Sequence, residues 1–485
     1  MYRREHLFTI IADLGDIFTL TAPVTCIPLL VSLISGEWDM FIPMATVPVS
    51  LFVLGTLLEN IPRSERGSRL STAMCSVALF WLTCAVVSSF PFMLGLHMGM
   101  TDALFEGMAG WTGTAFTLIP SVDTAPHTLL FWRTFMQWIG GIGIIAFAIT
   151  LGSSTGLSRS KMFRTESREE SLMPGAIATG RALWKIYGLL TFMAIGLILF
   201  TGLPLWESVN LGLSAISTGG FVIHQGGIPF YHNFLLELLL IPIMIAGALP
   251  FKLYFLIIDN KKLSLFGDEQ IRLFFLFLAI GIAVLSYDLF FFANLDVLPA
   301  LQQGVFTAVS TLTTTGFQTT NLGNWASVTI LFLAMLAFIG GASWSTAGGI
   351  KLSRVALSFR ALYWWFQRLY VTGKVLIPFK IEGRVIPKAT AELEAAKNML
   401  VVILSVLTIF IATLCIFQFS NTSFSMTKVV FSVVSAFSTV GLNTGFVSPD
   451  MPDVSKGILI GVMWLGRLEV IPVIMLIMAL LRRPD

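Results

Sequence analysis

Two short motifs recur four times along this chain at nearly constant spacing. The first is a segment containing Thr, Gly or both, and its four copies cover residues 111–116, 216–221, 313–317 and 437–442. The second is an apolar tetrad that ends in small residues in three of its copies, at 138–141, 244–247, 338–341 and 464–467. The two motifs lie 26, 27, 25 and 26 residues apart in the four copies. This regularity indicates one structural unit used four times.

The composition places these units in a membrane. Of the 485 residues, 55% are hydrophobic and 12% are charged, whereas soluble domains carry about 25% charged residues. Apolar runs of about 20 residues can cross a bilayer, and the chain has about ten of them. They lie near 17–35, 41–59, 71–96, 128–151, 182–203, 233–258, 270–293, 327–370 (interrupted), 395–418 and 457–481. We therefore expect an all-α polytopic membrane protein.

The basic residues predict the orientation of these spans. If the N-terminus is cytoplasmic, 26 of the 30 Lys and Arg residues fall in the segments on the cytoplasmic side. Cytoplasmic segments of membrane proteins carry such an excess of positive charge. We therefore expect a multi-pass protein of the cell inner (plasma) membrane with both termini in the cytoplasm.

Four outer segments do not resemble simple loops. The segments 98–127, 204–232, 294–326 and 420–456 are too weakly apolar to span a bilayer, yet too apolar to be solvated. Each contains the first motif, so we expect each to dip into the membrane and return. The predicted fold is four pseudo-symmetric repeats of helix, re-entrant pore loop and helix around one central pore, preceded by two extra helices. The expected parts are 1–65 for the extra helices and 66–155, 156–262, 263–390 and 391–485 for the repeats, with the broken helix in the third.

The first motif predicts a cation filter. A dehydrated monovalent cation exchanges its water shell for backbone carbonyls and hydroxyls, and glycine allows the left-handed turns that aim carbonyls inward. Ala115 stands where the other repeats have glycine, and a left-handed alanine costs about 1–2 kcal/mol. The segment 111–116 therefore either absorbs this cost or relaxes, so that its carbonyl no longer points at the ion. The predicted filter residues are Thr112, Thr114, Ala115, Thr218, Gly219, Gly220, Thr314, Thr315, Gly316, Thr439, Val440 and Gly441.

The second motif predicts two gating elements. Between 340 and 349 every residue except Trp344 is Gly, Ala, Ser or Thr, so we expect the span to unwind beneath the filter. A close-packed seam of small residues between helices is the alternative. Arg467 ends a tetrad whose other copies end in glycine, and an intramembrane Arg usually faces a polar path or a partner such as Glu469. The predicted gating residues are Gly340, Gly341, Ser343, Ser345, Thr346, Gly348, Gly349, Lys351 and Arg467.

With these motifs, above all residues 340–351, the chain resembles the Trk/Ktr/HKT superfamily of cation transporters, and most closely its TrkH branch. The resemblance covers the whole chain. It implies potassium uptake, a homodimer with one pore per subunit, and a TrkA-like cytosolic regulatory ring that binds the nucleotide. Potassium is then the substrate at the filter, and no cofactor is expected in this chain. In related plant transporters a serine at the first-repeat glycine accompanies sodium preference, so the resemblance makes Ala115 relevant to selectivity.

Two other functions compete with potassium uptake. A sodium-permeable or sodium-coupled transporter on the same fold stays open. A membrane-embedded enzyme would need a nucleophile and a base clustered within the spans, and the sequence has no such cluster, so we expect no enzyme. The five histidines are dispersed without metal-ligand spacing. The basic stretch 351–397 is expected to contact anionic lipids, with a partner surface as the alternative, and no nucleic acid is expected to bind.

Overall fold

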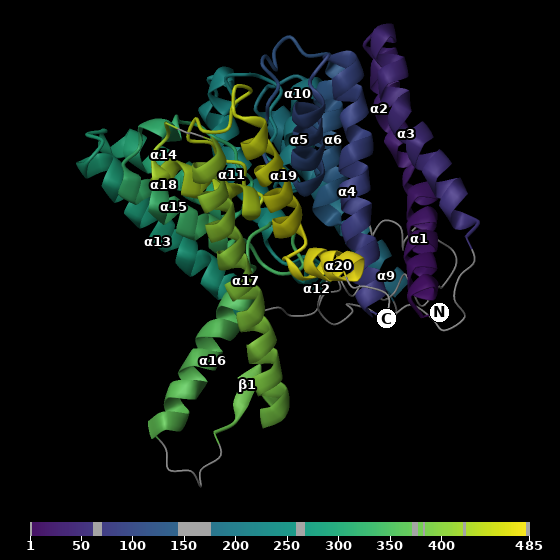
Figure 1. Ribbon diagram of the computed structural model, residues 1–485. Coiled ribbons are helices and arrows are strands. Elements are labelled where there is room, and N and C mark those ends of the chain that lie inside the picture. Colours follow the sequence, from purple (N-terminus) through teal and green to yellow (C-terminus); the bar gives the residue numbers. More distant parts are fainter. Residues whose placement is uncertain are drawn as a thin grey trace.

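The computed structural model describes residues 2–61, 70–143, 176–258, 267–370, 377–381, 384–420 and 423–481. Within these residues the strands are β1 (Phe379–Ile381) and β2 (Arg384–Ile386), an antiparallel pair, and the regular structure is otherwise helical. The helices pack side by side in one body, from which a single helical hairpin projects (Figure 1). The expected all-α membrane architecture is confirmed.

The N-terminal helices form an outer layer of this body. They are α1 (Tyr2–Thr21), η1 (Val24–Cys26), α2 (Ile27–Ile34) and α3 (Trp38–Glu59). The helical segments Phe8–Thr21 and Val24–Ile34 meet at 40°, so they can make one bent span. We expected this span at 17–35, but the helix begins at Tyr2. Asp13 and Asp16 are buried inside the protein, which allows the helix to start before its apolar run.

Each of the four repeats contains a long helix, a short pore helix and a second helix. The first has α4 (Leu70–Gly95), α5 (Met100–Thr112) and α6 (His127–Ile142), and the second has α9 (Ala176–Phe200), α10 (Leu205–Ile216), η2 (Ile228–Tyr231), α11 (Phe234–Ala248) and α12 (Phe251–Ile258). The third has α13 (Glu269–Phe291), α14 (Val297–Leu312), η4 (Leu322–Asn324), α15 (Ser327–Ile339) and α16 (Leu352–Tyr370). The fourth has α17 (Lys388–Ser420), α18 (Met426–Phe437), α19 (Asp453–Arg467) and α20 (Ile471–Leu481).

Of the four predicted boundaries, one can be compared with these helices. The boundaries at 65, 155 and 262 lie outside the described residues. The boundary at 390 falls inside α17, so the first helix of repeat four begins slightly earlier than expected. It begins directly after Pro387, which cannot donate a backbone hydrogen bond.

The second helix breaks in repeats two, three and four, although the sequence predicted a break only in the third. In repeat two, Leu249 is extended before Pro250, and the segments on either side meet at 92°. In repeat four, Glu469 and Val470 have positive φ, and α19 and α20 meet at 113°. In repeat one, α6 ends before Gly143, whose φ is +80°. The expected spans at 233–258 and 457–481 are therefore bent pairs of helices, and their breaks were not predicted.

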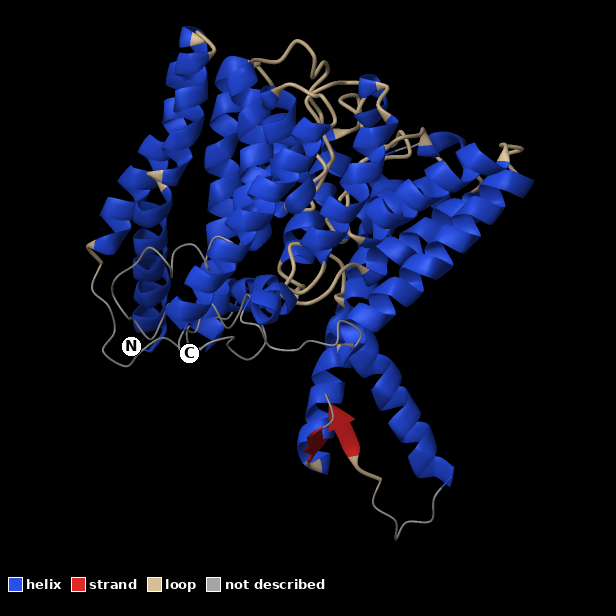
Figure 2. Cartoon of the chain, turned by 180° about the vertical axis from the view of Figure 1, so that it is seen from behind, coloured by secondary structure: helices blue, strands red, loops and turns tan. Residues whose placement is uncertain are grey.

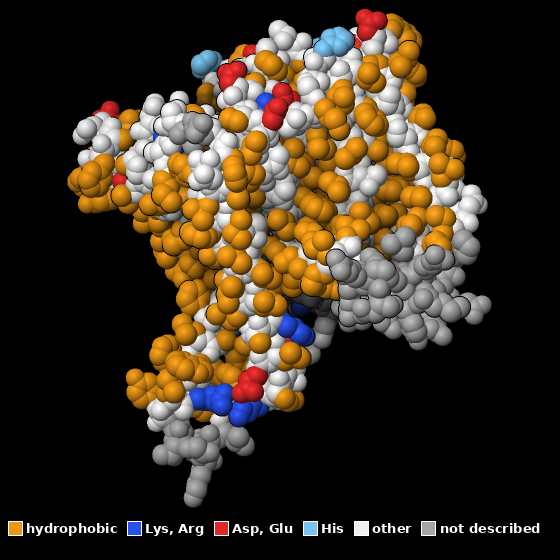
Figure 3. Space-filling model, in the orientation of Figure 1, with side chains coloured by type: hydrophobic (Ala, Val, Ile, Leu, Met, Phe, Trp, Pro, Cys, Tyr) orange, Lys and Arg blue, Asp and Glu red, His pale blue; other side chains and the backbone are white. Residues whose placement is uncertain are grey.

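The surface of the body is that of a membrane protein. Five described helices are long and apolar enough to cross a bilayer, and three bent pairs raise the number to eight. The other two of the ten expected spans, near 128–151 and 327–370, contain α6 (16 residues) and α15 (13 residues), which are too short to be counted with these eight. Hydrophobic side chains cover the flank of the body, and charged side chains gather toward its two ends (Figure 3).

The projecting hairpin consists of α16 and the first part of α17, joined near β1 and β2 (Figure 2). Trp364 packs inside the hairpin: its ring centre lies 5.2 Å from that of Phe379, and its indole N–H donates to the Ile377 carbonyl at 3.0 Å. The hairpin extends from the same end of the body at which α1 begins (Figure 1).

Candidate functional site: four pore loops and the loop beneath them

The four pore helices end in the same turn. A backbone N–H bonds to the carbonyl five residues earlier in each: Thr114 to Ala109 (2.9 Å), Gly219 to Ser214 (2.8 Å), Thr315 to Ser310 (2.9 Å) and Val440 to Ser435 (2.8 Å). The segments that follow are called pore loops one (113–116), two (218–221), three (314–317) and four (439–442). All twelve predicted filter residues lie in these loops or at the end of a pore helix. The geometry supports the predicted fourfold repeat.

Each pore loop opens with a residue in the left-handed conformation. These residues are Gly113 (φ +73°), Thr218 (+51°), Thr314 (+57°) and Thr439 (+53°). A β-branched residue rarely adopts this conformation, so the surrounding structure must hold the three threonines in it. Gly113 lies in the predicted loop motif but was not among the predicted filter residues, because threonine in the other repeats conceals that this position is left-handed.

A second left-handed position lies two residues later and closes the ring. It is Gly220 (φ +78°), Gly316 (+84°) or Gly441 (+80°) in repeats two to four. A Cβ added to Gly220 would overlap the Thr315 carbonyl, and one added to Gly316 would overlap the Val440 carbonyl. Each loop therefore contacts the next one, and the loops surround one axis. Only glycine fits these positions.

Ala115 is the matching residue of repeat one, and its φ is negative. Pore loop one has therefore relaxed: it avoids the left-handed conformation that the other three loops adopt here. The methyl carbon of Ala115 lies 2.8, 2.9 and 2.6 Å from the positions that a Cβ on Gly220, Gly316 or Gly441 would take. The methyl group thus occupies the space at the centre of the ring. The Ala115 N–H also donates to the Val440 carbonyl at 3.4 Å, which draws that carbonyl toward pore loop one.

The threonine hydroxyls of repeats one and three serve their own pore helices. Thr112 Oγ1 donates to the Met108 carbonyl at 2.7 Å and lies 2.9 Å from Thr114 Oγ1. Thr313 and Thr315 make the matching contact at 2.8 Å. These hydroxyls give their protons to groups of their own repeat, so their oxygen lone pairs stay candidate ligands beside the backbone carbonyls.

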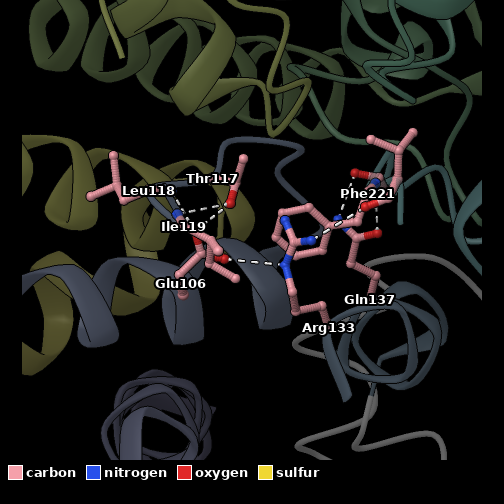
Figure 4. Close-up of polar contacts among 9 residues, drawn as sticks. Glu106, Thr117, Leu118, Ile119, Arg133, Gln137 and Phe221 are labelled. Atoms are coloured by element: carbon pink, nitrogen blue, oxygen red, sulfur yellow. Dashed lines mark hydrogen bonds and ion pairs between the residues drawn. The ribbon is translucent and has the colours of Figure 1, made fainter. Parts of the chain in front are cut away.

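A buried ion pair lies behind pore loops one and two (Figure 4). Arg133 Nε lies 3.3 Å from Glu106 Oε2, and both side chains are almost fully buried. The other Glu106 oxygen accepts from Thr117 Oγ1 at 2.7 Å and from the Leu118 N–H. The Arg133 guanidinium lies 4.0 Å from the centre of the Phe221 ring. Sequence reasoning missed this pair; the signal was a lone Arg in an apolar span.

Below the ring, the 340–351 loop separates α15 from α16, as expected from its small residues. It docks on the break between α11 and α12, where carbonyls lack helical partners. The Ala342 N–H donates to the Ala248 carbonyl and the Thr346 N–H to the Gly247 carbonyl, both at 3.1 Å. The Phe251 N–H donates back to the Trp344 carbonyl at 2.7 Å.

Most of the other predicted gating residues stabilise the 340–351 loop itself. Ser345 Oγ donates to the Ala342 carbonyl at 2.6 Å, and the ammonium of Lys351 donates to the Ala347 carbonyl. Ser343 Oγ lies 2.5 Å from Ser353 Oγ at the start of α16. Gly340 and Gly349 both have positive φ, and their backbones approach so closely that a Cβ on either would overlap the other. Gly341 packs directly against Ala347.

The top of the 340–351 loop touches three pore loops. Thr218 Oγ1 lies 3.2 Å from Thr346 Oγ1, and the Gly348 N–H donates to Thr314 Oγ1 at 2.7 Å. A Cβ on Gly348 would overlap Thr439 Oγ1 and the Ser438 carbonyl. The left-handed threonines therefore face this loop directly, whereas pore loop one has Gly113 there.

Arg467 lies beneath the pore loops, beside the 340–351 loop. Its guanidinium donates to the Thr346 carbonyl at 3.3 Å and to the Gly140 and Gly141 carbonyls at 2.5 and 3.1 Å. It therefore joins the 340–351 loop to the end of α6. The Glu469 carboxylate accepts from Arg354 Nε at 2.8 Å, which ties the break after α19 to the first turn of α16.

The tetrad alignment needs one correction, in repeat two. A Cβ on Gly140, Gly247 or Gly466 would meet the carbonyl of Trp111, Ile216 or Phe437, respectively. These three residues occupy equivalent positions near the ends of their pore helices. Gly247 thus matches Gly140 and Gly466. The residue that matches Gly141 and Arg467 in repeat two is Ala248, one position later than predicted, because the connection before α11 is longer.

Gly348→Ala is expected to raise basal cation flux several-fold. The added methyl group cannot lie against Ser438 and Thr439, so the 340–351 loop must move away from pore loop four. Ion flux into proteoliposomes measures the effect. Gly461→Ala in α19 is the matched control, because its Cβ would have no heavy atom within 4 Å. Equal flux in both variants would contradict the contact.

Known proteins share this fold and its sequence pattern. A profile of the TrkH family, described as cation transport protein, matches residues 49–484. The chain is 29% identical to an uncharacterized cation transporter of Methanocaldococcus jannaschii, over 98% of this chain and 96% of that one. It is 29% identical to the Trk system potassium uptake protein TrkH of Halomonas elongata, over 93% and 94%. The crystal structure of the potassium transporter TrkH from Vibrio parahaemolyticus superimposes with a TM-score of 0.83 at 24% identity, over 97% and 98%, which shows a shared fold.

Proposed function

Since the chain belongs to the TrkH family of cation transport proteins, we propose that it takes up potassium through the pore enclosed by its four pore loops. The observation that carries this proposal is the ring of four pore loops in contact with one another, with the Arg467 guanidinium directly beneath it. Curated relatives named as potassium uptake proteins support the choice of ion. A cation transport family is not a family of enzymes, which agrees with the sequence.

The ring supplies the chemistry that selects a cation. The backbone carbonyls of Thr114, Gly219, Thr315 and Val440 follow four left-handed residues, so we take them as one level of candidate ligands. Two of them are also hydrogen-bonded to protein groups: the Gly219 carbonyl to Gln137 Nε2 and the Val440 carbonyl to the Ala115 N–H. The pore helices also point the negative ends of their dipoles toward this level, which favours cations. Potassium enters from the side of the pore-helix N-termini and moves down its electrochemical gradient.

The 340–351 loop and Arg467 form the gate in this proposal. In the structure the loop lies against pore loops two to four, and the guanidinium adds a positive charge below them. Opening requires the loop to leave the Gly247 and Ala248 carbonyls, which removes the support that Thr346 gives to Arg467. Two discrete arrangements of one loop suit a switch.

The assembly and location are also proposals. We infer a homodimer with one pore per subunit, regulated by a TrkA-like cytosolic ring that binds the nucleotide. The chain lies in the inner (plasma) membrane with both termini cytoplasmic; the shared end of α1 and the basic hairpin supports this orientation. Anionic lipids are expected at the hairpin. This chain itself is proposed to bind only the transported ion.

Sodium permeation is the second candidate, and Ala115 favours it. The relaxed pore loop one places a methyl group where the other loops leave space, so one quarter of the ring is not built like the rest. A potassium cage that is incomplete discriminates less against sodium. The proposed pore therefore conducts potassium with limited selectivity.

Flux measurements test the proposed function. We expect purified protein in proteoliposomes to take up rubidium, and potassium to compete for uptake more strongly than sodium. Empty vesicles supply the background. Equal competition by both ions would favour the sodium-permeable alternative, and uptake no higher than in empty vesicles would refute a channel-like pore in this chain.

A further inference from the structure

Gln137 connects α6 of repeat one to pore loop two of its neighbour. The side chain is fully buried. Its Nε2 donates to the Gly219 carbonyl at 2.7 Å, and its Oε1 accepts from the Phe221 N–H at 3.1 Å (Figure 4). One amide group thus holds the backbone on both sides of Gly220. Ser214 Oγ on the pore helix also donates to Oε1, at 3.1 Å.

Pore loops three and four are held differently. Ser310 Oγ donates to the Phe317 carbonyl at 2.7 Å, and Ser435 Oγ donates to the Leu442 carbonyl at 3.0 Å. Each of these serines lies on the pore helix of its own repeat. Ser214 is the matching residue in repeat two, but its hydroxyl donates to Gln137 instead. Pore loop two therefore depends on a side chain from outside its repeat.

The sequence of pore loop two explains why it needs this support. It has consecutive glycines, Gly219 and Gly220, where loops three and four have Thr315–Gly316 and Val440–Gly441. Two glycines in succession leave the backbone the largest choice of conformations. A Cβ on Gly219 would lie 2.5 Å from Gln137 Cδ, so the amide fills the space that a side chain would use in the other loops.

We propose that Gln137 is a selectivity-determining positioning residue, which fixes the Gly219–Gly220 peptide of the filter. The proposal rests on the proposed function, because it assumes that pore loop two is part of the filter. Without the amide, the Gly219 carbonyl loses its donor and the peptide can rotate. A rotating ligand fits potassium and sodium equally well, so discrimination falls while a pore remains.

The test compares two variants that change this contact with one that does not. Gln137→Met keeps the length of the side chain and removes its hydrogen bonds. Gln137→Glu keeps the acceptor for Phe221 and Ser214 and removes the donor to Gly219; its carboxylate lies one helical turn from Arg133, which helps it fold. Thr134→Val is the control, because Thr134 Oγ1 donates to Asn210 Oδ1 at 2.7 Å between the same two helices without touching the loop.

The readout is the ratio of potassium to sodium competition against rubidium uptake. We expect the ratio to fall about fivefold in Gln137→Met and Gln137→Glu, which corresponds to about 1 kcal/mol, and to stay at the wild-type value in Thr134→Val. If Gln137→Met does not assemble, the Gln137→Glu variant decides. An unchanged ratio, or an equal fall in Thr134→Val, overturns the inference. A wild-type protein without uptake removes the proposed function and this inference together.

Discussion

Arg467→Ala is expected to raise basal cation flux by about tenfold or more. Two unit charges 4 Å apart repel by about 4 kcal/mol at an effective dielectric constant of 20. A tenfold change in flux needs only about 1.4 kcal/mol of this repulsion to be removed. The guanidinium binds the Thr346 carbonyl directly below the pore loops, and in the proposed pore it adds a positive charge to the path of a cation. The substitution also frees the 340–351 loop from the end of α6. Rubidium uptake without any regulator measures basal flux.

Two further variants separate these contributions for Arg467. Arg467→Lys keeps the charge but cannot bind the Gly140 and Gly141 carbonyls with a planar guanidinium, so we expect an intermediate flux. Arg368→Ala removes an exposed positive charge from the hairpin and controls for net charge. Basal flux in Arg467→Ala equal to that in Arg368→Ala would place Arg467 outside the permeation path.

Ala115→Gly is expected to raise both the flux and the preference for potassium over sodium. Removing the methyl group clears the centre of the ring, and glycine can adopt the left-handed conformation of Gly220, Gly316 and Gly441. Pore loop one can then present its backbone carbonyl to the ion as the other three pore loops do. We expect a gain in selectivity of about fivefold to tenfold, which corresponds to about 1–1.4 kcal/mol. Competition between potassium and sodium against rubidium measures it.

Ala115→Ser is the matched control for this prediction. Serine keeps a Cβ in the same place, so the centre of the ring stays occupied and pore loop one stays relaxed. We expect its selectivity to remain close to that of the wild type. The same potassium-to-sodium ratio in the wild-type protein and in the Ala115→Gly and Ala115→Ser variants would mean that this residue does not contribute to the filter.

The repeated features of the site could be predicted from the sequence, and the contacts between repeats could not. The pore helices and the unwound segment at 340–351 follow from local composition, because glycine, threonine and small residues recur at fixed spacing. The pairing of Glu469 with Arg354 joins residues 115 positions apart, and no local pattern encodes it. The Glu106–Arg133 pair was equally hidden, although an Arg within an apolar span was a usable signal.

The breaks in repeats two and four show a different limit. Pro250 was visible in the sequence, but hydropathy treats 233–258 as one apolar run. The left-handed Glu469 and Val470 carry no sequence signature, since neither residue favours that conformation. Tertiary packing decides these turns, and only the assembled ring reveals them.

Because the four pore loops belong to a single polypeptide, evolution can alter this pore one quadrant at a time. In a pore built from four identical chains, one codon change is copied into every quadrant, and a substitution such as alanine at the central glycine would put four methyl groups on the axis. Here the gene carries four separate versions of the same position, and three remain glycine. The chain can thus explore alanine at one quadrant and arginine at another, with the unchanged quadrants keeping the pore assembled.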